Sequence, residues 1–156
     1  MESRSIQFDG SSQPPRKGAD PLVRFVTAQA PVYASVLAEL GAGRKQSHWM
    51  WFIFPQLAAL GRSPTAKFYG LADLDEARDY LRHPVLGPRL LECTRLVNAL
   101  DGRTLNQIFG TPDDLKFRSC VTLFHHAAPK EAVFTEALQK YCGSEDERTV
   151  QALEEE

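Results

Sequence analysis

Two short stretches of this sequence carry side chains that could bind or transform a ligand. The first combines cationic, imidazole and indole groups in the residues Arg44, Lys45, His48, Trp49 and Trp51. Arginine and lysine can hold a phosphate or a carboxylate, and histidine exchanges a proton near neutral pH. A tryptophan ring can stack on a base or a sugar. We therefore expect His48 to supply acid–base chemistry and the other four residues to bind a ligand.

The same stretch also has a purely structural interpretation. Trp49, Phe52 and Ile53 recur with the i, i+3, i+4 spacing of a helix face that packs into a core. Arg44 and Lys45 could simply cap the end of the preceding helix. The sequence leaves both interpretations open.

The second stretch follows the strongest helix-start signal of the chain, Thr111-Pro112-Asp113-Asp114. On a helix that begins at Pro112, the side chains of Asp113, Lys116 and Ser119 share one face. We expect Asp113 to act in catalysis with His48, and Lys116 and Ser119 to contact the ligand. An ion pair between Asp113 and Lys116 without any function is the alternative.

Two glutamines lie at proline breaks and complete the candidate set. Gln29 precedes Pro31, and Gln56 follows Pro55. A proline frees backbone carbonyl groups that then need a donor. Each amide could satisfy the backbone or contact a ligand, and the backbone role is favoured.

Metal binding, nucleophilic catalysis and cofactor binding are not expected. The adjacent His125 and His126 point to different sides of a helix, and the sequence has no HxxxH or CxxC spacing. Cys120 lies in an apolar stretch, which favours a buried thiol over a reactive one. The sequence also lacks a G-x-S-x-G elbow, a P-loop and a G-x-G-x-x-G fingerprint.

Length and composition indicate one globular domain. The chain has 156 residues and a formal charge of -2, so it lacks the basic footprint of a protein that binds nucleic acid. Neither a membrane span nor a signal peptide is predicted. Its three cysteines are odd in number and widely spaced, which is typical of reduced thiols in a cytoplasmic protein.

Caps and prolines predict an all-α fold of seven to nine short helices. We expect residues 1–19 to form a flexible leader, because they are polar and contain consecutive prolines, and residues 20–156 to form the domain. The expected helices run from Pro21 to a break at Pro31, over Val32–Leu40, over Trp49–Phe54 with Ser47 as cap, over Leu74–Arg82 with Asp73 as cap, over 84–100, from Pro112, over 129–143 and from about Asp146. Two short helical turns are expected besides, one opened by Ser63-Pro64 and one from Thr104 to Phe109.

The motifs together resemble one bacterial family, the domain of unknown function 1810. The resemblance covers about residues 20–153, and its most specific part is the aromatic stretch from Gly43 to Gln56. It implies an all-α bacterial domain and implies no activity. Some members carry a calpastatin label, which we discount, because such an inhibitor would be a long disordered chain. The polar positions carried over from the family pattern are Gln29, Arg44, Lys45, His48, Gln56, His83, Arg89, Asp113, Lys116, Ser119 and Thr122.

Two functional hypotheses follow. In the first, both stretches line one pocket for a small anionic or nucleotide-like molecule, with hydrolase or glycosidase chemistry on a phosphate-bearing substrate as an extension. In the second, the aromatic block from Trp49 to Phe54 binds a protein partner or closes a homodimer. Polar groups from both stretches that meet in a concave site favour the first hypothesis, and a flat exposed tryptophan patch favours the second.

Overall fold

The computed structural model describes residues 20–156, so the expected leader at 1–19 lies outside the described residues. This part of the chain forms ten α-helices, one 3₁₀ turn and one π-helical turn. They are α1 (Val23–Gln29), α2 (Tyr33–Gly41), α3 (Met50–Ile53), the 3₁₀ turn η2 (Ala58–Leu60), α4 (Pro64–Phe68), α5 (Leu74–Arg82), α6 (Leu86–Asn98), α7 (Leu105–Phe109), α8 (Asp113–Ala127), α9 (Ala132–Ala137), the π-helical turn η3 (Leu138–Cys142) and α10 (Glu147–Glu154).

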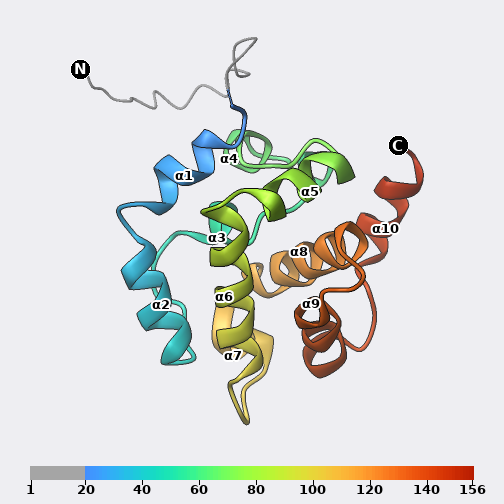
Figure 1. The fold of residues 1–156 in the computed structure, drawn as a ribbon. Coiled ribbons are helices and arrows are strands. Elements are labelled where there is room, and N and C mark those ends of the chain that lie inside the picture. Colours follow the sequence, from blue (N-terminus) through green and yellow to red (C-terminus); the bar gives the residue numbers. More distant parts are fainter. Residues whose placement is uncertain (1–19) are drawn as a thin grey trace, which may run out of the picture.

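Helix α8 is the central element of the fold. It packs against α5, α7, α9 and α10, which surround it in Figure 1. Phe117, Cys120, Val121, Leu123 and Phe124 along its length are fully buried. A helix buried on so many sides must satisfy its polar side chains internally or direct them to a particular place on the surface.

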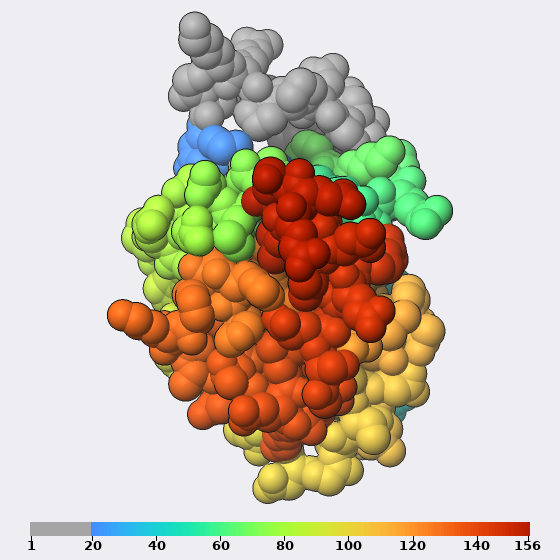
Figure 2. Space-filling view, turned by 90° about the vertical axis from the view of Figure 1, so that its right-hand side faces the viewer, coloured from blue at the N-terminus to red at the C-terminus, as the bar shows by residue number. Residues whose placement is uncertain are grey.

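Helices α1 and α2 lie at the left side of Figure 1, with α2 against α6. Helix α1 packs against the short helix α3, which lies nearer the middle of the molecule. The C-terminal helix α10, red in Figure 2, lies across the face between the green α5 segment and the orange α8–α9 segment. Within residues 20–156 no helix is long and apolar enough to cross a membrane.

The all-α class is confirmed, and the number of helices is slightly higher than expected. Two segments expected as single turns, Pro64–Phe68 and Leu105–Phe109, form α-helices. Most of the predicted caps are also present. The side chains of Ser63, Asp73 and Asp146 accept the expected backbone N–H bonds, and Thr104 forms a complete capping box with Gln107.

Several predicted helix starts and caps are wrong in detail. Helix α6 begins at Leu86 rather than at residue 84, and α8 begins at Asp113 without the side-chain cap expected before Pro112. Helix α1 begins at Val23 rather than at Pro21, although the Asp20 carboxylate does accept a hydrogen bond from the Leu22 N–H at 2.9 Å. Helix α9 begins at Ala132, because residues after Pro129 first complete a turn. Ser47 does not cap α3, since its side chain bonds to Glu39 instead.

Candidate functional site

Glu39 on α2 shapes the loop that carries the first polar stretch. Its Oε1 atom accepts hydrogen bonds from the backbone N–H groups of Gln46 (2.7 Å) and Ser47 (3.0 Å) and from the Trp49 indole N–H (2.9 Å). Its Oε2 atom accepts from the Ser47 hydroxyl. Because one carboxylate serves four donors, the loop from residue 44 to residue 49 has a fixed shape.

These hydrogen bonds also set the ionisation of Glu39. Burial alone would raise its pKa, but the donors from Ser47, Gln46 and Trp49 stabilise the charged form and lower the pKa from 4.5 to about 2. Glu39 therefore stays ionised well below neutral pH.

The chain turns sharply between α2 and this loop. Gly43 has a φ angle of 77°, in the left-handed region that favours glycine, and its carbonyl accepts a hydrogen bond from Arg103 at 2.8 Å. The Lys45 N–H then donates to the Ile108 carbonyl of α7 at 2.7 Å. Because α7 immediately precedes α8, these bonds bring the loop to the start of α8.

Lys45 and Lys116 meet at Asp113, the first residue of α8. The Lys45 Nζ atom lies 2.9 Å from Asp113 Oδ2, and the Lys116 Nζ atom lies 3.2 Å from Asp113 Oδ1. The side chains of Lys45 and Asp113 are 8% and 18% exposed, so water screens this pair less than a surface ion pair. Asp113 thus joins the two polar stretches of the sequence through ion pairs.

Both lysines also lie over tryptophan rings. The Lys116 Nζ atom is 3.6 Å from the ring centroid of Trp51, and the Lys45 Nζ atom is 5.2 Å from that of Trp49. Trp49 is buried, whereas Trp51 is partly exposed. We call these five residues, Lys45, Trp49, Trp51, Asp113 and Lys116, the lysine–tryptophan cluster.

The ionised groups of this cluster do not balance. Two ammonium groups share one carboxylate, which leaves one positive charge. Helix α8 adds to it, because the N-terminal end of a helix carries a partial positive charge. The cluster is therefore suited to an anion.

Arg44, His48 and Gln56 lie close in sequence to the cluster without entering it. Arg44 and His48 are exposed, and Gln56 is partly exposed. Within residues 20–156 no side-chain hydrogen bond or ion pair joins any of the three to another residue. In this state His48 and Asp113, expected as an acid–base pair, are not bonded to each other.

Gln29 belongs to a different network, on the far side of α3. Its Nε2 atom donates to the Phe52 carbonyl at 2.7 Å and contacts the Tyr80 hydroxyl at 3.1 Å. Gln29 thus bonds to a backbone carbonyl, but to one of α3 and not to one freed by Pro31. Within residues 20–156 the side chain of Gln56 makes no such bond. Arg89 donates to the Oε1 atom of Gln29 at 3.3 Å.

Ser119 and Thr122 lie further along α8 and hold the cap of α10. The Ser119 hydroxyl lies 3.1 Å from Asp146 Oδ2, and the Thr122 hydroxyl accepts the Asp146 N–H at 2.9 Å. Thr122 is fully buried and Ser119 nearly so. The structure therefore separates these two residues from Asp113 and Lys116.

The cysteines are free and protonated. Burial raises the pKa of Cys93 to about 12 and that of Cys142 to about 11, and it also raises the pKa of the fully buried Cys120. Cys120 therefore has the character of an inert thiol, as expected. Among residues 20–156 no group of three or more His, Cys, Asp and Glu side chains is arranged to hold a metal ion.

Sequence reasoning missed Glu39, which positions the whole first stretch. The residue lies on the helix before the motif, and its carboxylate reaches forward by seven to ten residues. A glutamate at the last turn of a helix is unfavourable for the helix dipole. This unfavourable position in the helix was the available sign that the Glu39 carboxylate accepts hydrogen bonds from outside the helix.

Comparisons with known proteins bear on the fold. Residues 19–153 match the model of a family described as Protein of unknown function (DUF1810). The crystal structure of the conserved hypothetical protein Rv1873 from Mycobacterium tuberculosis is similar to this chain, with 57% sequence identity and a TM-score of 0.85. The match covers 86% of this chain and 99% of that one. A search of proteins with curated descriptions finds no match.

Proposed function

This chain belongs to the DUF1810 family, and we propose that it binds a small anionic molecule at the lysine–tryptophan cluster. The observation that carries the proposal is the meeting of Lys45 and Lys116 on the single carboxylate of Asp113. An anionic group of the ligand takes the charge that Asp113 leaves uncompensated. Lys116 is the first contact, because its side chain is more exposed than that of Lys45.

The aromatic neighbours favour a ligand with a flat part, such as a nucleotide-like molecule. Trp51 is partly exposed beside Lys116, and an indole ring binds a base or a sugar ring by stacking. Lys116 lies over this ring, so a ligand that draws the ammonium group toward its phosphate uncovers the indole. Arg44, exposed on the same loop as Lys45, adds a third cation.

His48 is the candidate acid–base residue if the bound molecule is also hydrolysed. Its imidazole is exposed on the loop that Glu39 fixes, three residues after Lys45. Asp113 is held by two ammonium groups, and we assign it the role of positioning both lysines. Turnover would then depend on His48, and binding would depend on the lysines.

The burial of the aromatic block favours a ligand over a protein partner. Trp49, Met50, Ile53 and Phe54 are at most 3% exposed, so most of the block is core. A protein interface needs a contiguous apolar surface of several hundred Å². The partly exposed Trp51 and Phe52 are suited to a smaller contact.

A thermal-shift screen against nucleotides, sugar phosphates, NAD and ADP-ribose tests the proposal. A compound at about 100 times its dissociation constant stabilises the fold by about 2.7 kcal/mol. We expect Lys116→Met, which keeps the aliphatic chain and removes the charge, to weaken binding by about tenfold or more. Lys130→Met is the matched control, because Lys130 is exposed in the turn before α9.

Two results would contradict the proposal. One is that no anionic compound raises the melting temperature of the wild-type protein. The other is a stabilising compound that binds Lys116→Met and Lys130→Met equally well. For a compound that is turned over, His48→Asn should lower kcat by about 100-fold while its dissociation constant stays the same.

A further inference from the structure

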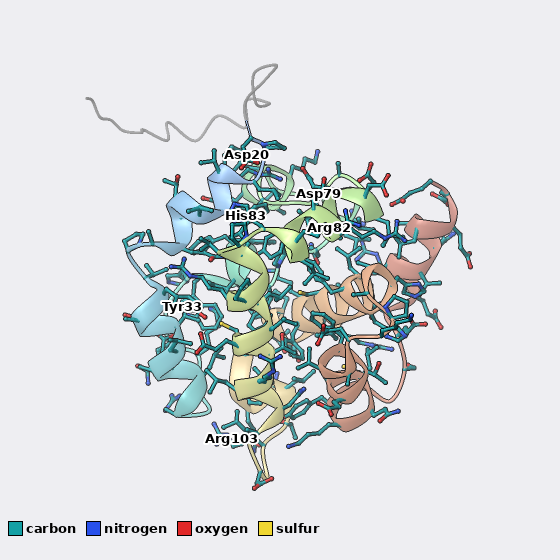
Figure 3. All side chains as sticks on the ribbon, viewed as in Figure 1. Asp20, Tyr33, Asp79, Arg82, His83 and Arg103 are labelled. Atoms are coloured by element: carbon teal, nitrogen blue, oxygen red, sulfur yellow. The ribbon has the colours of Figure 1, made fainter. Side chains whose placement is uncertain are left out.

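Arg89 on α6 lies outside the lysine–tryptophan cluster and has a distinctive set of neighbours. Its guanidinium carbon is 4.4 Å from the ring centroid of Tyr33, which Figure 3 labels on α2 beside α6. Its Nη1 atom donates to Gln29 Oε1 at 3.3 Å. The guanidinium is thus stacked on one side and bonded at one corner.

Each of the other partly buried arginines of residues 20–156 bonds to a main-chain carbonyl or pairs with a carboxylate, although the Nε–H of Arg103 is buried without a partner. Arg24, Arg103 and Arg118 donate to main-chain carbonyl oxygens, and Arg78 pairs with a carboxylate. Arg89 contacts neither kind of acceptor in the described part of the chain. Its position is therefore not explained by a role as a backbone anchor or as half of an ion pair.

Gln29 fixes the orientation of Arg89. The Phe52 carbonyl can only accept a hydrogen bond, so the amide nitrogen of Gln29 must face it at 2.7 Å. The amide oxygen must then face Arg89. Since Gln29 is only 1% exposed, it cannot easily rotate away, and it holds Nη1 in place.

The remaining edge of the guanidinium, with Nε–H and Nη2–H, has no protein acceptor in the described residues. These two N–H groups are parallel and lie in one plane, which matches the two oxygens of a carboxylate or a phosphate. The stacked Tyr33 ring covers a face of the guanidinium and leaves this edge open.

Glu92, one turn further along α6, is bonded to Tyr33 rather than to Arg89. Its Oε1 atom accepts a hydrogen bond from the Tyr33 hydroxyl at 2.5 Å and forms no ion pair with Arg89. Burial, together with the bond to Glu92, raises the pKa of Tyr33, so the hydroxyl stays a donor. Within residues 20–156 Arg89 therefore has no ion-pair partner.

We propose that Arg89 is a second anion-binding site, which takes a carboxylate or phosphate group on its Nε–H and Nη2–H edge. Gln29 and Tyr33 are positioning residues that hold the guanidinium ready. The site shares no residue with the lysine–tryptophan cluster, so its test is separate from that of the proposed function.

Side-chain NMR of the arginine Nε–Hε groups tests this site directly, with acetate and inorganic phosphate as probes. The Arg89 signal is identified by its loss in Arg89→Lys. We expect it to shift with saturation, at a dissociation constant on the order of 1 mM, as suits one bidentate contact. The Nε–H of Arg24 already donates to the Phe68 carbonyl and serves as an internal control that should not move.

Each outcome is informative when sodium chloride at matched ionic strength is the reference. Saturation by both probes supports a general oxyanion site, and saturation by phosphate alone supports a phosphate site. No saturable shift of the Arg89 signal, or equal shifts of Arg89 and Arg24, overturns the proposal. In Arg89→Lys, backbone amide shifts should report binding weakened by about tenfold, because lysine lacks the planar fork. An unchanged melting temperature of this variant excludes unfolding as the cause.

Discussion

At the start of α8, the donors to Asp113 within residues 20–156 are the ammonium groups of Lys45 and Lys116, whereas two turns later Ser119 and Thr122 bond to Asp146. Asp146 Oδ2 also accepts from the N–H and the hydroxyl of Thr149, so its donors are neutral groups. Both carboxylates connect α8 to another part of the chain. They differ in the kind of donor that satisfies them.

That difference separates a structural network from a candidate site. The neutral donors around Asp146 come from rigid backbone and from short side chains. If one of these hydrogen bonds breaks, its donor is left without an acceptor. Lysine side chains are long and flexible, and an anion can replace the carboxylate as their partner. Glu39 resembles Asp146 in this respect, because all its donors are neutral. Glu39 and its four hydrogen bonds therefore form a fixed frame for the loop that carries Lys45. The lysines at Asp113 can exchange that carboxylate for an anionic ligand.

Removing the frame should have the largest effect. We expect Glu39→Ala to lower the free energy of unfolding by about 3 kcal/mol, because four donors lose their acceptor. Urea denaturation measures this change. Ser47→Ala removes a single donor and should cost about 1 kcal/mol. Equal costs for the two variants would mean that Glu39 does not hold the loop.

Removing the cap of α10 should give the next largest loss of unfolding free energy. We expect Asp146→Ala to cost about 2 kcal/mol, since it removes an N-terminal cap together with the partner of Ser119. Asp146→Asn, which can still accept a cap bond, should recover about half of the loss. Neither variant should change ligand binding at Lys116 while the fold is intact. A loss of ligand binding in a folded Asp146→Asn variant would contradict the purely structural role of the Asp146 network.

The ion pair of Lys45 with Asp113 should show a smaller but measurable coupling. A double-mutant cycle with Lys45→Met and Asp113→Asn should give about 1.5 kcal/mol, because both groups are largely buried. The exposed pair of Arg82 with Asp79 is the control and should give about 0.3 kcal/mol. High salt should reduce the control coupling more strongly. Similar values for the two pairs would show that burial adds nothing at Asp113.

Features set by neighbours in sequence were predictable, and features set by distant groups were not. The caps at Ser63, Asp73 and Thr104 and the break at Pro31 follow from local backbone chemistry, and all of them are present. The pair of Asp113 with Lys116 has the i, i+3 spacing of a helix and forms as the alternative interpretation expected. None of these predictions needed the fold.

Ser47 illustrates the other case. A serine before an apolar run is a sound cap signal, but the carboxylate of Glu39 on the preceding helix outcompetes the backbone of α3 for its hydroxyl. The contact between Lys45 and Asp113 likewise depends on the bond of the Lys45 N–H to α7. Ser119 shares the predicted face with Asp113 in sequence terms, yet the packing of α10 gives it a different partner. In each case the local sequence allows several partners, and the tertiary packing determines which partner the side chain contacts.

The acid limb of stability offers the finest test of the frame. The folded-state pKa of Glu39 is about 2, below its ordinary value of 4.5, so its contribution is complete above pH 4.5 and is lost as the pH falls toward 2. Glu39→Gln keeps an acceptor oxygen and removes the titration. Between pH 5 and pH 3 the wild type should therefore lose about 1 kcal/mol more unfolding free energy than this variant, after allowance for partial exposure. Urea denaturation at both pH values measures the difference, and other carboxylates cancel because both proteins contain them. Equal losses of unfolding free energy in the two proteins would mean that the charge of Glu39 is dispensable. An uncharged acceptor oxygen would then be enough to hold the loop.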